Sequence, residues 1–218
     1  KESAEKNFEK MKTKWSKQGI RIKSFIDYGP VAGTIVQFAS KHKADLIVMG
    51  TQGATGLKDY FVGSNTEKIV RRSAVPVIPV KKFVKAASIG DIVFPINLEK
   101  DLEDQENLTI KVKDVQDFFK AKVHMLYVNT PASFQPDKDS RKVLTEFAKR
   151  FLFKNYTLNI FNDIDPEEGV INFGHEIGAD MITMSTHGRR GLNHLMSGST
   201  AEDVVNHMDC PIWTSVEK

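Results

Sequence analysis

The sequence has a single cysteine, Cys210, and lacks any apolar run long enough to cross a bilayer. One cysteine excludes an intrachain disulfide and, with seven methionines, suits a reducing compartment. A membrane-spanning helix needs about 20 consecutive apolar residues, and the amino-terminal stretch KESAEKNFEKMK is a charged helical pattern, unlike a signal peptide. We therefore expect a cytoplasmic protein with no membrane partner.

The sequence also lacks a large excess of either positive or negative charge. The 31 basic and 28 acidic residues give a formal charge of +3 and are spread along all 218 residues. Proteins that bind nucleic acid usually gather their lysines and arginines into a patch. We expect no nucleic-acid partner.

The six histidines show no metal-ligand spacing with Cys210, so we expect no zinc site or other metal centre.

An internal repeat is the strongest feature that the sequence does contain. Sliding the chain by 135 positions places DLIVMGTQGATGLKDYFVGSNTEKIV, from Asp45, on DMITMSTHGRRGLNHLMSGSTAEDVV, from Asp180, without a gap. The same offset also pairs Phe38 with Phe173, outside this stretch. A whole domain is therefore duplicated, not only one motif.

The repeat divides the chain into two expected domains. The first repeat covers residues 1–82 and the second covers residues 88–218, with KKFVKAAS as the linker. Residues 88–135 have no counterpart, because the matching positions would precede Lys1. We expect the first domain to be incomplete at its amino-terminal side; natural shortening, trimming and loss of a segment all stay open as the cause.

The second repeat alternates strand and helix patterns. The stretches IGDIVFPI, KVHMLYV, YTLNIF, DMITMS and PIWTSV predict five strands, and sequences with helical spacing of apolar residues separate them. The first repeat begins at the position of the second helix in this order. It continues with the predicted strands IRIKSFIDY, DLIVMG and VPVIPV. Strands joined by helices run parallel, which predicts an α/β fold of two doubly wound, Rossmann-like parallel-sheet domains in tandem.

The last strand of each repeat is apolar and would lie at a sheet edge. Exposed apolar edges favour pairing with another strand. We expect VPVIPV and PIWTSV to bring the repeats together as an intrachain pseudo-dimer, with a homodimer as a further option.

Glycines are set out as G-x2-G-x9-G-S directly after the strand DLIVMG, at Gly50, Gly53 and Gly63, followed by Ser64. The loop leaves the carboxyl end of a parallel strand, which is the usual ligand-binding edge of such sheets. Glycine permits a positive φ and a close ligand approach, and the free N–H groups of the next helix form an anion site. The spacing, found twice, predicts phosphate binding.

A second interpretation of the same residues needs no ligand. Ser64 and Glu67 have the S-x-x-E spacing of a capping box, as do Ser199 and Glu202. In addition, no Ser/His/Asp group, carboxylate pair or Walker-type lysine accompanies the glycines, so no nucleophile or base is identified. We expect a protein that is not an enzyme.

The segments GTQGATGLKDYFVGS and STHGRRGLNHLMSGS resemble the nucleotide-binding signature of universal stress proteins, G-x2-G-x9-G-S/T. The order of strands and helices is similar too, as is CPIW before the last strand. The resemblance implies an adenine nucleotide alpha hydrolase-like fold and a stress-response protein that binds ATP, with Mg2+, as a regulatory or sensing ligand. An interaction module of the same fold that binds no nucleotide is the alternative, and weak ATP hydrolysis is the remaining enzymatic alternative.

The resemblance also implies which residues hold the nucleotide. In the first repeat these are Met49, Gly50, Gln52, Gly53, Gly63, Ser64, Asn65 and Thr66. In the second they are Pro95, Asn97 and Val128 on the adenosine side, and Met184, Ser185, His187, Gly188, Gly198, Ser199 and Thr200 on the phosphate side.

Two positions depart from the family pattern. Asn97 stands where the nucleotide-binding members have Asp, and it can donate a hydrogen bond where a carboxylate only accepts. Ser185 replaces the first glycine and adds a side chain there. Arg189 and Arg190 are candidates for neutralising phosphate, and His187 and His194 for polar contacts to it; a solvated surface is the alternative for all four.

Overall fold

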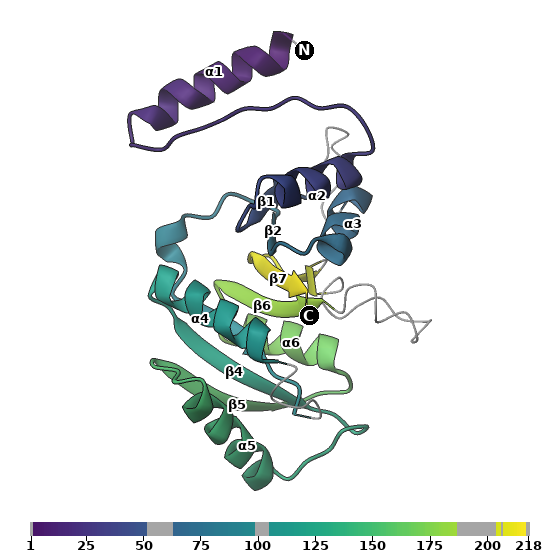
Figure 1. Ribbon diagram of the computed structural model, residues 1–218. Coiled ribbons are helices and arrows are strands. Elements are labelled where there is room, and N and C mark those ends of the chain that lie inside the picture. The colour runs from purple at the N-terminus through teal and green to yellow at the C-terminus, as the bar shows by residue number, and fades with distance from the viewer. Residues whose placement is uncertain (1, 52–62, 99–104, 187–203, 206, 217–218) are drawn as a thin grey trace.

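Helices and strands alternate along the chain in the computed structural model, which describes residues 2–51, 63–98, 105–186, 204–205 and 207–216 (Figure 1). The elements, in chain order, are α1 (Glu2–Ser16), α2 (Val31–Lys41), β1 (Ile47–Gly50), α3 (Ser64–Arg72), β2 (Val77–Val80), a 3-10 turn (Ala86–Ser88), β3 (Asp91–Pro95), α4 (Glu106–Phe119), β4 (Lys122–Asn129), α5 (Asp137–Arg150), β5 (Tyr156–Asn162), α6 (Pro166–Glu176), β6 (Met181–Thr186) and β7 (Ile212–Val216).

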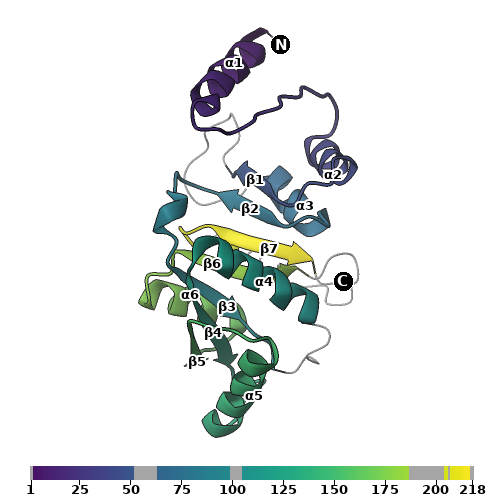
Figure 2. The same cartoon turned by 60° about the vertical axis from the view of Figure 1, so that its left-hand side comes forward.

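The strands form one sheet in the order β1-β2-β7-β6-β3-β4-β5 (Figure 2). Neighbouring strands are parallel except β2 and β7, which run antiparallel with Val77 opposite Thr214. The predicted α/β class is therefore confirmed. The strands of the two repeats share this sheet and meet at β2 and β7.

The chain reverses direction across the sheet at β3. From β3 it moves outward through β4 to β5, and then returns on the other side of β3 as β6. In open parallel sheets, ligands bind outside the carboxyl ends of the strands at such a reversal. The carboxyl ends of β3 and β6 are therefore the place to look for a site.

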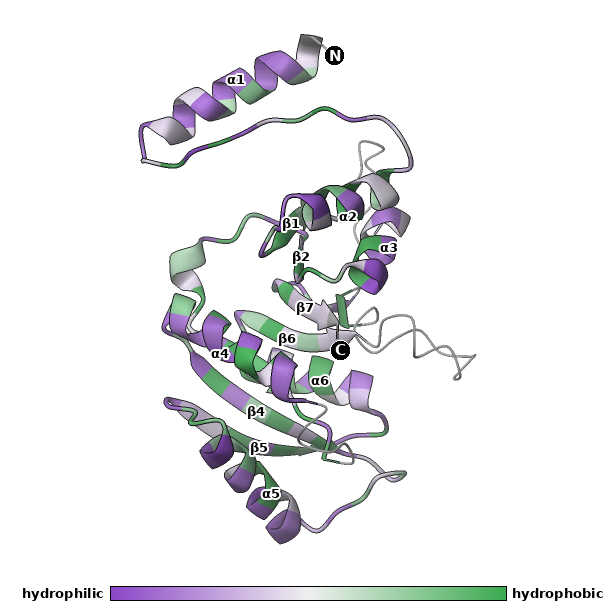
Figure 3. Ribbon diagram, viewed as in Figure 1, coloured by the Kyte–Doolittle hydropathy of each residue, from purple (hydrophilic) through white to green (hydrophobic). Residues whose placement is uncertain are grey.

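Strand β3 separates two apolar layers. Phe94 is fully buried with Leu144 and Phe147 of α5 on one face, while Val93 packs with Val170 of α6 on the other. Hydrophobic residues accordingly recur along the strands, and hydrophilic residues cover much of α1 and α5 (Figure 3). Burial on both faces explains why β3 is a continuous apolar run instead of an alternating one.

Helix α6 has a capped amino-terminal end and lies very close to the sheet. Pro166 occupies the first turn, and the Asp165 side chain accepts a hydrogen bond from the Glu168 N–H at 2.9 Å. A Cβ built on Gly169 would lie 2.3 Å from Cγ1 of Val128. Gly169 is thus required by the approach of α6 to β4.

Matching helices of the two repeats end in matching conformations. Lys43 after α2 has a φ of 51°, and Gly178, 135 positions later, has a φ of 62°. Gly19 after α1 and Leu152 after α5 are also left-handed, with φ of 77° and 54°, although the 135-residue offset does not pair these two positions. A left-handed residue just past the last turn is a common helix stop.

The strand predicted for IRIKSFIDY is wrong, since residues 20–28 form no strand. The equivalent strand of the second repeat is β5, which pairs with β4 along its whole length. Positions equivalent to β4 in the first repeat would precede Lys1. No strand in the described part of the chain lies beside residues 20–28, and a strand depends on the hydrogen bonds of such a ladder.

Both views show α1 apart from the sheet, at the end of the molecule where β1 lies (Figures 1 and 2). Of the helices that the structure describes, none combines the length and the apolar character needed to cross a bilayer.

Candidate functional site

The candidate residues of the adenosine side gather at the carboxyl edge of the second repeat. Strand β3 pairs with β6 through Ile92–Met181 and Val93–Ile182. Continuing this register by two residues places Pro95, the last residue of β3, beside Met184. On its other side, Pro95 is the partner of Leu126 in β4, two residues before Val128. The structure thus brings Pro95, Met184 and Val128 to neighbouring strand ends.

The burial of these residues determines which of their side chains a ligand could reach. The side chains of Val128 and Met184 are buried in the layer beneath α6. Asn97 is exposed just beyond β3, where its carbonyl oxygen accepts a hydrogen bond from Gln105 Nε2 at 2.9 Å. Ser185 is half-buried. Asn97 and Ser185 are therefore the polar candidates whose side chains a ligand could reach, while Val128 would act through its backbone.

Sequence reasoning missed a polar cluster beside Ser185. Ser215 of β7 is the register partner of Ser185, and Lys111 Nζ of α4 donates to Ser215 Oγ at 2.9 Å. In the first repeat the equivalent pair is Gly50 and Val80. A comparison of the two repeats could have revealed Ser215, because the 135-residue offset aligns this polar residue with the apolar Val80.

Thr186, the last residue of β6, carries a buried hydroxyl that lacks a hydrogen-bond partner in the described part of the chain. Only 3% of Thr186 is exposed. Leaving such a group unpaired costs about 1–3 kcal/mol, so native structures usually supply a partner. The described residues therefore leave the hydroxyl of Thr186 available at the strand end where the glycine loop begins.

A hollow of about 490 Å³ opens at the carboxyl ends of β4 and β5, next to Val128. Asn129 and Asn162 line this hollow as register partners, and Asn129 Nδ2 donates to Asn162 Oδ1 at 3.0 Å. Phe134 and Ile164 also line it, and both are largely exposed. Apolar side chains beside a few polar groups are a common feature of small-molecule sites.

In the first repeat, the structure places Met49 and Gly50 at the end of β1 and Gly63 before α3. The Gly63 N–H donates to the Thr51 carbonyl at 3.3 Å, which holds the start of the helix against the strand end. Ser64 and Asn65 are exposed in the first turn of α3, whereas Thr66 is buried. Ser64 and Asn65 are thus the accessible polar candidates here.

The conformational role predicted for two glycines is wrong. Gly63 has a φ of −59°, and Gly50 also lacks a positive φ. A Cβ on Gly63 would lie 3.2 Å from the Thr51 carbonyl oxygen, whereas one on Gly50 would meet no atom of the described residues within 4 Å. Close approach of backbone to backbone explains Gly63. No described residue accounts in this way for Gly50.

The capping box at Ser64 is also absent. Gly63 is the N-cap, no side chain caps the helix, and Ser64 is the first helical residue. Because the helix starts one residue earlier than the capping box requires, the Ser64 hydroxyl is not at the cap. Glu67 instead lies 3.7 Å from Arg71 across one helical turn.

Much of the predicted phosphate side lies outside the described residues. These positions are Gln52, Gly53, His187, Gly188, Arg189, Arg190, His194, Gly198, Ser199, Thr200 and Glu202. The site geometry therefore rests on the strand ends, and the phosphate contacts stay a prediction from the sequence.

Comparison with known proteins relates the chain to one family. The profile of the universal stress protein family matches residues 1–81 and 161–215. A universal stress protein of Methanocaldococcus jannaschii is 43% identical over 81 residues, which are 37% of this chain and 46% of that one. A second protein of that organism is 35% identical over 81 residues, which are 37% of this chain and 50% of the other. The matches therefore span about half the length of these curated relatives.

A solved structure agrees over nearly the whole chain. The crystal structure of a universal stress protein from Archaeoglobus fulgidus aligns with a TM-score of 0.75 at 22% identity and covers 99% of this chain and 77% of that one. At this identity the likeness shows the fold. The family profile covers more than half of the sequence. The chain therefore belongs to the universal stress protein family.

Proposed function

We propose that this chain is a stress-response protein that binds an adenine nucleotide, ATP, as a regulatory or sensing ligand at the carboxyl edge of its second repeat. The observation that carries the proposal is the register of β3 and β6, which places Pro95 beside Met184 at the reversal of strand order. Asn97 and Ser185 flank this point with accessible polar side chains.

The adenosine side is supported by the hollow beside Val128. The residues that line it include apolar Phe134 and Ile164 and the hydrogen-bonded pair Asn129 and Asn162. A planar heterocycle suits such a lining because its faces are apolar and its edge forms hydrogen bonds. The exposed Asn97 side chain can both donate to and accept from a ribose or a base.

The phosphate side is supported by the glycine signature and by Thr186. The loop after β6 carries Gly188, Gly198 and Ser199 in the spacing of the family motif. Thr186 offers a hydroxyl at the start of this loop. Mg2+ would enter with the phosphates as part of the ligand, because this ion is usually held by phosphate oxygens and one or two protein groups.

We further propose that the ligand is not turned over and that residues 1–82 and 88–218 act as two domains of an intrachain pseudo-dimer in the cytoplasm. The antiparallel contact of β2 with β7 supports the pairing, and Lys82 Nζ lies 3.0 Å from Asp209 Oδ2 beside it. A sheet shared in this way gives one domain a direct contact with the other. A homodimer, in which two such chains pair, is a further option.

An interaction module that binds no nucleotide is the second candidate. Asn97 and Ser185 favour it, because both differ from the residues of nucleotide-binding members and both are accessible. Mass spectrometry of nucleotides released from protein purified from its host separates the two. The proposal expects ATP, ADP or AMP in a fixed ratio to protein. Protein free of nucleotide that also fails to bind added ATP would favour the interaction module.

A further inference from the structure

Lys111 of α4 reaches the carboxyl ends of β6 and β7. Its Nζ donates to Ser215 Oγ at 2.9 Å, across 104 positions of the sequence. Ser215 is only 2% exposed, whereas Lys111 and Ser185 are half-buried. Ser215 and Ser185 are register partners on adjacent parallel strands, so their side chains project from the same face of the sheet. An ammonium group therefore lies beside the end of β6.

The face from which these serines project is the one that α4 covers. Leu108 of α4 packs in one apolar layer with Met181 of β6 and Trp213 of β7. Side chains alternate along a strand, so Ser215, two residues after Trp213, lies on this face, and Thr186 lies on the other. The glycine loop therefore leaves β6 with an ammonium group on one face and the buried Thr186 hydroxyl on the opposite face.

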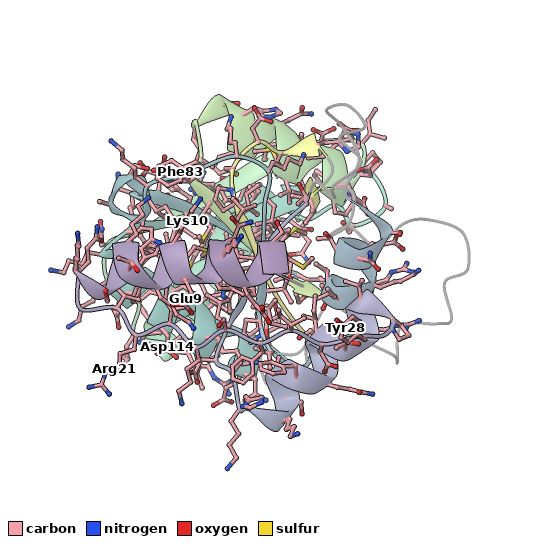
Figure 4. The ribbon with its side chains drawn as sticks, turned by 90° about the horizontal axis from the view of Figure 1, so that it is seen from above. Glu9, Lys10, Arg21, Tyr28, Phe83 and Asp114 are labelled. Atoms are coloured by element: carbon pink, nitrogen blue, oxygen red, sulfur yellow. The ribbon has the colours of Figure 1, made fainter. Side chains whose placement is uncertain are left out.

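Other charged side chains of α4 reach different parts of the molecule. Glu106 Oε2 lies 4.0 Å from Arg150 Nη2 of α5, and Lys113 Nζ donates at 2.6 Å to the carbonyl of the residue that follows α5. Asp114 is exposed and lies toward the outside of the molecule in the view from above (Figure 4). Lys111 thus supplies a positive charge from α4 to the ends of β6 and β7.

The two serines beside Lys111 distinguish the second repeat from the first. The 135-residue offset aligns Ser185 with Gly50 and Ser215 with Val80, which are also register partners and carry no hydroxyl group. Ammonium and hydroxyl groups both donate hydrogen bonds, and a lysine binds phosphate as a point charge. The polar groups at this strand end are therefore of the kind that binds a phosphate group, and they belong to the repeat that carries the proposed nucleotide site.

We infer that Lys111 binds a phosphate group of the nucleotide and that Ser215 positions it, an inference that rests on the function proposed above. A half-buried ammonium group is screened by salt less than an exposed one, so its attraction for phosphate is stronger. Lys111 would make the site select nucleotides over adenosine. Ser185, as the register partner of Ser215, borders the approach to this ammonium group, so a glycine at position 185 would widen the approach.

Calorimetric titrations with adenosine, AMP and ATP, at constant ionic strength, test the role of Lys111. We expect Lys111→Met to weaken the binding of AMP and ATP by about tenfold and to leave adenosine binding unchanged. Lys111→Arg should retain most of the affinity. Lys142→Met, at an exposed position of α5, removes the same charge and should change none of the three affinities. Equal weakening of adenosine and ATP by Lys111→Met would overturn the inference.

Ser215 is tested as a positioning residue by rescue and by a double-mutant cycle. We expect Ser215→Ala to weaken ATP binding, and Ser215→Thr, which keeps a hydroxyl group, to restore it. In the Lys111→Met chain, Ser215→Ala should have no further effect on ATP binding, because Ser215 acts through Lys111. Additive effects of the two substitutions would contradict the positioning role.

Tripolyphosphate, which has no base, separates this inference from the proposed function. In a titration followed by NMR, we expect it to shift the amide signals of residues 184–186 and 213–216 in the native chain but not in Lys111→Met. Such shifts in a chain that binds neither adenosine nor ATP would support a site for free phosphate compounds, while nucleotide binding would be contradicted. A native chain without these shifts would overturn the inference, even where adenosine binds beside Val128.

Discussion

Val77 of β2 and Thr214 of β7 are antiparallel partners at the point where the two repeats meet. The Thr214 hydroxyl donates to the Val77 carbonyl at 3.1 Å, and each residue is only 1% exposed. On one side of this contact, Val77 packs in the small apolar layer formed with Ile69 and Ala39. The contact therefore links the core of the first repeat to the sheet of the second.

Replacing Val77 with lysine tests this link. A lysine there would bury an ammonium group in an apolar layer, and we expect the free energy of unfolding to fall by about 3 kcal/mol. Ile212→Lys should act similarly, since Ile212 is equally buried. Urea denaturation followed by fluorescence should show one cooperative transition shifted to lower urea. Phe83→Lys serves as the exposed control, and two independent transitions with only one of them shifted would contradict the link.

Gly169→Ala tests the approach of α6 to β4. The new methyl would overlap Val128, and we expect a loss of about 1–3 kcal/mol in the free energy of unfolding from overpacking. Adding Val128→Ala should recover part of that loss by making room, which a double-mutant cycle measures. Gly33→Ala in α2 is the control: its Cβ meets no atom within 4 Å, so we expect unchanged or slightly higher stability. Full additivity of the two substitutions would show that Gly169 and Val128 do not interact.

We expect the Cys210 thiol to make the free energy of unfolding depend on pH in the alkaline range. Burial raises the pKa of Cys210 from 9.0 to about 12. Between these values the unfolded chain loses the thiol proton while the folded chain keeps it. The stabilisation is therefore complete below pH 9 and falls as the pH rises toward 12.

Urea titrations at pH 8 and at pH 10.5 check this dependence. We expect the native chain to lose more stability than Cys210→Ser over this range, since serine does not titrate there. The thiol should also react slowly with iodoacetamide at pH 8 until the chain is unfolded. Equal losses in the two proteins, with fast alkylation of the folded chain, would mean that the thiol is accessible.

The strands and helices of the second repeat are predicted well from the sequence, because the local pattern of each element agrees with the tertiary structure around it. The apolar runs of β3 and β6 and the Asp165-Pro166 start of α6 are local signals that the tertiary structure reinforces. Segment 20–28 has an equally good strand pattern and forms no strand. Strand formation there depends on a partner, which no local pattern reports.

The site is predicted only in part for a similar reason. The candidates at the strand ends follow from element order, so Pro95, Met184 and Ser185 fall where the sequence places them. The link from Lys111 to Ser215 spans 104 positions and depends on how α4 lies over the sheet. The role of Gly63 is likewise set by the distance to the Thr51 carbonyl, which spacing alone does not give.

Isothermal titration of the 218-residue chain with ATP and Mg2+ is the most direct test of the proposed function. We expect weak binding with at most one site per chain, tightened by Ser185→Gly with Asn97→Asp and lost in Gly198→Val. The first pair restores the family residues at the reversal of strand order, and the last fills the predicted phosphate loop. The control is Gly33→Ala in α2, where an added Cβ meets no described atom within 4 Å, and it should leave the heat unchanged. The absence of binding heat in the native chain and in the Ser185→Gly, Asn97→Asp chain, both folded by circular dichroism, would contradict nucleotide binding by the second repeat.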